Sequence, residues 1–197
     1  QNQVLGVKSS ITWDLEQTHY LGVHSLEVRK NVKQRKSDQQ VQVRRDILTL
    51  VALSKWVIND GKFDPNAGFS YGGIPVWDTH VVYRTDQTAD ATVKLERIVL
   101  HNNSTRVSAK TLGTPSGFTT FSNLSWDAKS RPDAVRLSTL AKSVSHFEVE
   151  PGSTRQMINV KLRILEDTGD ISNAVEENHK ETTVIFGIRP KNTVPKL

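Results

Sequence analysis

Alternating apolar and polar residues are the dominant pattern along the chain, and this alternation is typical of β-strands. The clearest example is 158–164, where four aliphatic side chains alternate with three polar or charged ones. Phe147 lies in a similar stretch just before it, and Pro151 and Gly152 stand between the two. Proline presets φ for a turn and glycine accepts positive φ, so this dipeptide favours a reversal of the chain. The pattern therefore predicts an antiparallel hairpin over 147–165.

Shorter stretches of the same kind predict further strands. They fall at 26–28, 41–43, 74–83, 93–100 and 184–188. The first two flank a charged segment like the arms of a hairpin, and the last is ended by Pro190, which cannot donate to a ladder. The stretch 47–58 is rich in β-branched residues but as long as a helix. We interpret it as a strand that leads into a bend.

Two helix signals interrupt the strand pattern. Ser130 and Pro132 resemble a helix start because proline suits the first turn. Val135, Leu140 and Val144 would then share one face. A second short helix is predicted over 172–179. Seven or eight short strands with so little helix predict an all-β, mostly antiparallel fold. We expect a β-sandwich or a jelly-roll-like arrangement with one or two short helices.

The length of the chain favours one folding unit. With 197 residues, we expect a single β-sandwich domain over 1–197. The terminal segments 1–10 and 189–197 are expected to be extended and to contact neighbouring subunits. The C-terminal segment contains two prolines and would need a partner surface to become ordered.

The positive charge of the chain is concentrated in one segment, 29–45. This segment carries seven cationic residues and one carboxylate, Asp38, a net charge of +6, whereas the whole chain carries +5. The rest of the chain is therefore close to neutral. A local cluster of this kind attracts polyanions, and each neutralised phosphate releases counterions. The same charges also suit an edge-guarding hairpin, in which Lys and Arg prevent unwanted strand pairing.

The cationic residues of this segment are the candidate nucleic-acid contacts. They are Arg29, Lys30, Lys33, Arg35, Lys36, Arg44 and Arg45. No aromatic residue lies between Val28 and Val43, so the segment lacks the stacking surface of a single-strand binding site. If the segment binds RNA or DNA, it contacts the phosphate backbone and does not read the base sequence.

Metal and cofactor chemistry has little support in the sequence. The chain has no cysteine, which excludes disulfides, zinc–thiolate sites and thiol catalysis. Its six histidines are scattered, and no two have the spacing of a local metal site. The oxygen-rich stretch 59–66, with Asp60 and Asp64, leaves a calcium site open, although turn formation explains the same residues. We expect no metal and no cofactor.

The known catalytic motifs are also missing. The stretch 113–117 has the wrong spacing for a nucleophile elbow, and the chain has neither a phosphate-binding loop nor a dinucleotide-binding motif. No apolar run approaches the roughly 18 residues of a membrane-spanning helix. We therefore expect a protein that is not an enzyme and that has no membrane span.

A β-rich fold, one basic segment and long polar connections together favour a structural role. The connections 59–73, 101–118 and 166–182 exceed the usual loop length, and such loops are commonly functional. We predict a self-assembling viral coat subunit, located in the virion, that binds copies of itself and contacts nucleic acid through 29–45. Two alternatives stay open: a phage tail tube or ring subunit, and a surface or secreted β-sandwich binding module.

Overall fold

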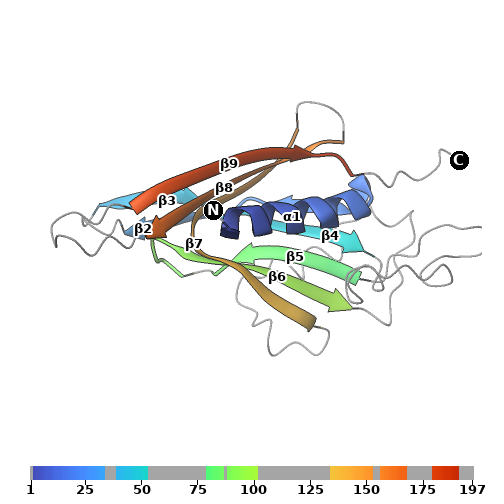
Figure 1. Ribbon diagram of the computed structural model, residues 1–197, viewed down its shortest axis with the longest axis horizontal. Coiled ribbons are helices and arrows are strands. Elements are labelled where there is room, and N and C mark those ends of the chain that lie inside the picture. Colours follow the sequence, from blue (N-terminus) through green and yellow to red (C-terminus); the bar gives the residue numbers. More distant parts are fainter. Residues whose placement is uncertain are drawn as a thin grey trace, which may run out of the picture.

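The described part of the chain forms one curled antiparallel sheet of seven strands, with an α-helix in its curve (Figure 1). A computed structural model describes residues 2–33, 39–52, 79–86, 88–101, 134–152, 156–167 and 179–190. The order across the sheet is β1-β4-β5-β6-β7-β8-β9, and β2 and β3 form a separate two-stranded ribbon. The bounds are β1 (Val23–Leu26), β2 (Arg29–Lys33), β3 (Gln40–Arg44), β4 (Ile47–Ala52), β5 (Thr79–Thr85), β6 (Val93–His101), β7 (Ala134–Pro151), β8 (Ile158–Asp167) and β9 (His179–Ile188). The predicted class, a mostly antiparallel and sandwich-like β fold, is confirmed.

The β2–β3 ribbon is inserted between two strands that pair with each other. β1 and β4 are neighbours in the large sheet, with Leu26 opposite Ile47, and the residues between them form the ribbon and its two connections. Figure 1 shows the ribbon toward one end of the described part. The sequence predicts the arms of a hairpin at 26–28 and 41–43, and only the second arm is confirmed, as part of β3. The first arm is wrong, because Leu26 pairs with β4 and the partner of β3 is β2, within the basic segment itself.

Helix α1 (Asn2–Gln17) packs an apolar stripe against the concave side of the sheet (Figure 1). Val4, Val7, Ile11 and Leu15 are three or four residues apart and buried in one core with residues of β4 to β9. The prediction of an extended segment over 1–10 is wrong. These four side chains are shielded from solvent only because the curled sheet covers them, so packing against the sheet stabilises the helix.

Two hydrophobic cores lie on opposite faces of the central strands. The smaller core contains Val28, Ile47, Val82, Ile98 and Leu100. The larger core contains the apolar stripe of α1 and, from β5, Val81 and Tyr83, the two residues that flank Val82. All six residues of β4 are buried. A strand that is buried on both faces shows no polar alternation, which explains why 47–58 was ambiguous in the sequence.

Strand β7 occupies the position where the sequence suggested a helix. It pairs with β6 along its first half and with β8 along its second half. Register shifts interrupt both ladders, one of them between Val144 and His146, and such irregularities disturb the apolar–polar alternation. The helix predicted to begin at Ser130 and Pro132 is therefore wrong from residue 134 onward. Pairing on both sides of the strand overrides the weak helix signal.

The C-terminal strands match the sequence pattern. β7 and β8 pair with Phe147 opposite Leu162, and β8 and β9 pair with Val160 opposite Phe186. The predicted hairpin and the predicted last strand are both confirmed. The strand predicted at 93–100 is confirmed as β6.

Several sequence-based expectations lie outside the described residues. They are the helix predicted over 172–178, the calcium-type stretch 59–66, the first part of the strand 74–83, most of the three long connections, and the C-terminal segment after Pro190. His179, which ended the predicted helix, is the first residue of β9.

Candidate nucleic-acid interface

The two faces of the β2–β3 ribbon differ in their chemistry. Side chains alternate along a strand, and the register pairs Arg29 with Arg44 and Lys33 with Gln40. One face, here called the polar face, therefore carries Arg29, Asn31, Lys33, Gln40, Gln42 and Arg44. The other face carries Lys30, Val32, Val41 and Val43. Val32 and Val43 are buried, so this second face is turned toward the protein.

The polar face is open to solvent along most of its length. All of its members are exposed except Arg44, whose side chain is 20% exposed. Arg29 donates from Nη1 to Gln42 Oε1 at 3.4 Å and from Nε to Glu27 Oε1 at 2.5 Å. The hydrogen bond from Arg29 lowers the pKa of Glu27. The face thus presents guanidinium, ammonium and amide groups in rows along two paired strands.

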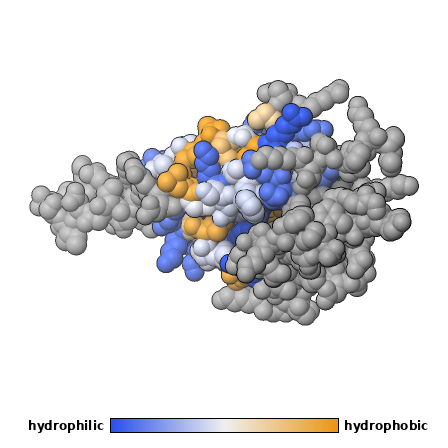
Figure 2. Space-filling model, turned by 45° about the vertical axis from the view of Figure 1, so that its right-hand side comes forward, coloured by the Kyte–Doolittle hydropathy of each residue, from blue (hydrophilic) through white to orange (hydrophobic). Residues whose placement is uncertain are grey.

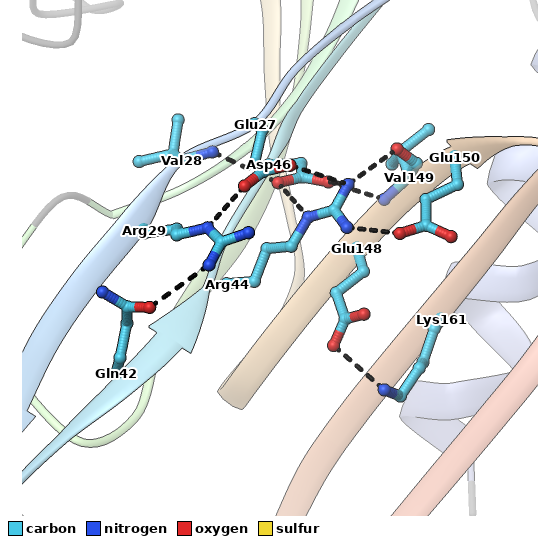
Figure 3. A network of polar contacts seen from close by, with 10 residues as sticks. All are labelled: Glu27, Val28, Arg29, Gln42, Arg44, Asp46, Glu148, Val149, Glu150 and Lys161. Atoms are coloured by element: carbon cyan, nitrogen blue, oxygen red, sulfur yellow. Dashed lines mark hydrogen bonds and ion pairs between the residues drawn. The ribbon is translucent and has the colours of Figure 1, made fainter.

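Asp46 fastens the base of the ribbon to strand β7 (Figure 3). Its buried carboxylate accepts hydrogen bonds from the backbone N–H groups of Val28 at 3.2 Å and Val149 at 2.8 Å. It also accepts from Arg44 Nε at 2.9 Å and lies 2.7 Å from Arg44 Nη2. The backbone N–H of Asp46 donates to the carbonyl oxygen of Phe147 at 2.7 Å. Both oxygens of this carboxylate are therefore occupied by protein donors.

Arg44 belongs to the same network and is largely neutralised there (Figure 3). Besides Asp46, its guanidinium forms an ion pair with Glu150 and donates to the carbonyl oxygen of Val149 at 3.2 Å. The hydrogen bond to Asp46 outweighs burial and raises the pKa of Arg44. A cation that is already paired with two carboxylates has less to gain from a phosphate. Arg44 therefore anchors the base of the ribbon.

Arg45 points into the protein and is 0% exposed. Among the described residues, its guanidinium donates to four backbone carbonyl oxygens: Ser145 at 3.3 Å, Thr88 at 3.2 Å, Asp90 at 2.7 Å and Ala91 at 3.0 Å. Burial lowers the pKa of Arg45. The side chain holds the connection between β5 and β6 against β7, and its charge does not reach the polar face.

The structure thus separates the seven cationic candidates. Arg29, Lys33 and Arg44 share the polar face, Lys30 lies on the opposite face, Arg45 is buried, and Arg35 and Lys36 lie outside the described residues. The amides Asn31, Gln40 and Gln42 belong to the polar face but were not among the candidates. The signal that could have found them is the two-residue period that they share with the cations of the same strands.

Other kinds of site receive no support from the described part of the chain. Within those residues, no group of three or more His, Asp or Glu side chains could hold a metal ion. The helix that the structure describes is too short and too polar to cross a membrane.

Comparisons with known proteins leave the interpretation to the structure. No protein-family model matches the chain, and no curated protein or solved structure matches it significantly. The geometry of the ribbon and of the sheet therefore carries the functional argument.

Proposed function

We propose that this protein is a structural, self-assembling subunit, a viral coat protein whose copies enclose nucleic acid. The observation that carries the proposal is the polar face of the β2–β3 ribbon. It is exposed, it combines cations with amides, and the Asp46 network holds its base against β7. In this proposal the protein is located in the virion, and the ribbon contacts the phosphate backbone of RNA.

The chemistry of the polar face suits phosphate groups. Arg29 and Lys33 provide charged donors, and the amides of Asn31, Gln40 and Gln42 provide neutral N–H donors beside them. Such side chains make most contacts to the nucleic-acid backbone, and these contacts position the strand without reading its sequence. The interaction we expect is therefore strong at low salt and tolerant of base sequence.

Charge along the ribbon changes from its base to its tip. At the base, Asp46 and Glu150 pair with Arg44, and Glu27 forms an exposed ion pair with Arg29. Toward the tip, Lys33 forms no ion pair with the described residues, and the sequence adds Arg35 and Lys36 beyond it. The base therefore supports the ribbon, and Lys33, together with Arg35 and Lys36 of the sequence, supplies the charge that attracts a polyanion.

The size and content of the purified particle test the proposal. Negative-stain images and light scattering should show closed shells, and the absorbance ratio should reveal copurified nucleic acid. Cylinders would support the tail tube or ring subunit instead. A monodisperse monomer of 22.1 kDa without nucleic acid would overturn the proposal and favour the surface or secreted binding module.

Salt dependence tests the ribbon itself. The logarithm of the RNA-binding constant should fall with the logarithm of the salt concentration. In the Lys33→Ala/Lys36→Ala variant this fall should be less steep, by about 0.7 for each lost single-strand phosphate contact. Lys94→Ala/Lys142→Ala is the matched control, because it removes the same charge from two exposed positions elsewhere in the sheet. An unchanged slope in the ribbon variant, or an equal loss in both variants, would show that the ribbon is not the contact.

A further inference from the structure

Strand β9 ends the large sheet, and within the described residues its outer edge pairs with no strand. Its ten residues all pair with β8, and this ladder contains no register shift. A long, regular edge presents a row of N–H and C=O groups to which another strand can add. Natural edge strands commonly block such pairing with bulges or internal prolines, and β9 has neither.

The outward face of β9 has an exposed apolar centre with a charge on each side. Ile185 is 69% exposed, more than any other large hydrophobic residue in the described part. Side-chain alternation places Thr183, Gly187 and Glu181 on the same face, and Arg189 directly follows the last residue of β9. Glu181 forms an ion pair with Arg163 at 2.8 Å, and its side chain remains 43% exposed. The negative charge lies four residues before Ile185, and the positive charge lies four residues after it.

We infer that β9 pairs antiparallel with β9 of a second copy of this chain, about a two-fold axis at Ile185. In this register Ile185 lies opposite its own counterpart, and Thr183 lies opposite Gly187. Glu181 lies opposite Arg189 on both sides of the axis, so the contact has two equivalent cross-strand ion pairs. Opposite charges and apolar side chains in directly opposed positions both stabilise a strand pair. A shift of two residues in either direction loses both ion pairs.

The neighbouring surface of α1 supports the same occupant. Lys8 lies 6.0 Å above the ring of Phe186 and, together with Glu16, lines a groove of about 410 Å³ beside residues 186–189. Leu5 is 62% exposed and, at three residues before Lys8, lies on the same stripe of the helix. Figure 2 shows hydrophobic areas between hydrophilic ones on the face of the molecule that it presents. The two-fold axis places the α1 stripes of both copies on the same side of the joined sheet.

This inference rests on the proposed self-assembly and identifies the surface through which two copies associate. It requires no nucleic acid. The partner is a second copy because the strand complements itself: its apolar centre lies on the axis, and its two opposite charges are equally distant from that axis. Isologous contacts of this kind are the commonest basis of protein dimers.

Cysteine cross-linking tests the register, because the chain contains no cysteine of its own. Ile185→Cys places two thiols directly opposite each other, with Cβ atoms about 4.5–5.5 Å apart, and a small adjustment permits a disulfide. Oxidised glutathione should therefore convert this variant into a covalent dimer on a non-reducing gel. Thr183→Cys is the matched control, because its thiols would be about 14 Å apart. Equal cross-linking of both variants would overturn the register.

A charge substitution tests the contact at equilibrium. Ile185→Lys places two like charges on the axis and should raise the dissociation constant of the dimer at least about tenfold in sedimentation experiments. Trp13→Lys is the control, because Trp13 is 51% exposed on a different side of α1. Urea unfolding of both variants verifies that they are folded. Unchanged association of the Ile185→Lys variant would overturn the inference.

The outcomes separate this inference from the proposed shell. Dimers that cross-link through Ile185→Cys but never form larger particles would support the β9 contact and overturn the shell. Shells that form without cross-linking would overturn the β9 contact alone. A wild-type protein that stays monomeric at every concentration would overturn both.

Discussion

Asp14 of α1 and Arg97 of β6 form a two-point ion pair beneath the helix, with Arg97 Nε 2.7 Å from Oδ2 and Arg97 Nη2 3.0 Å from Oδ1. The carboxylate is 1% exposed and the guanidinium side chain 12% exposed. The hydroxyl of Tyr83 donates to the same carboxylate at 2.5 Å. Burial raises the pKa of Tyr83 well above its ordinary value, and the negative charge of Asp14 raises it further. Burial alone would lower the pKa of Arg97, but the bonds to Asp14 outweigh it and raise that pKa.

We predict that Asp14→Ala lowers the free energy of unfolding by about 3–5 kcal/mol, because it leaves the Arg97 guanidinium buried without a counter-charge. Urea denaturation followed by tryptophan fluorescence measures this change. Lys161→Ala is the control. Its ion pair with Glu148, at 3.1 Å, is more exposed and should contribute no more than about 1 kcal/mol. Equal losses of unfolding free energy in the two variants would show that the pair beneath α1 stabilises the fold no more than an exposed pair does.

Replacement of Arg45 should destabilise the fold, even when the new residue is lysine. An ammonium group cannot reach the carbonyl oxygens of Ser145, Thr88, Asp90 and Ala91 together, so Arg45→Lys leaves buried acceptors unpaired. We expect a loss of about 1–3 kcal/mol in the free energy of unfolding.

The control for this prediction is Arg29→Lys, an exposed change that should alter stability by less than about 0.5 kcal/mol. Hydrogen exchange should also accelerate in the connection between β5 and β6 of the Arg45→Lys variant. If exchange in that connection is unchanged, Arg45 does not hold it in place.

The stability of the fold should decrease in mild acid through His146. Burial lowers the pKa of His146, and the positive charge of Arg163 lowers it further. The folded chain therefore takes up this proton at a lower pH than the unfolded chain, whose histidine pKa is near 6.5. The unfolded state therefore binds more protons in this window. The contribution of His146 to the free energy of unfolding is complete above pH 6.5 and is lost as the pH falls below that value.

The measurement is the free energy of unfolding of wild type and His146→Gln between about pH 5 and 8. The variant should lose less stability than the wild type toward the acidic end, and the two curves should run parallel at the alkaline end. Identical curves over the whole range would rule out a contribution from His146.

Much of the strand content could be predicted from the sequence, because alternation is a local property. The half-buried strand β8 needs only its own residues to show which side chains face the core, and Pro151-Gly152 marks the turn before it. Helix α1 could not be found in this way. Its stripe of Val4, Val7, Ile11 and Leu15 is narrow and rich in β-branched residues, so it becomes stable only against the curled sheet.

The concentration of positive charge in 29–45 was also determined by the sequence, but the roles of its members were not. Arg44 and Arg45 are adjacent in the chain, yet one anchors the ribbon through Asp46 and Glu150, and the other is buried among carbonyl oxygens. Several of these partners lie 45 to 106 residues away along the chain. Only tertiary structure brings such groups together, because burial and ion pairing depend on distance in space. Arg44 and Arg45 are drawn into contacts within the protein, so the exposed face is formed mainly by Arg29, Lys33 and their amide neighbours.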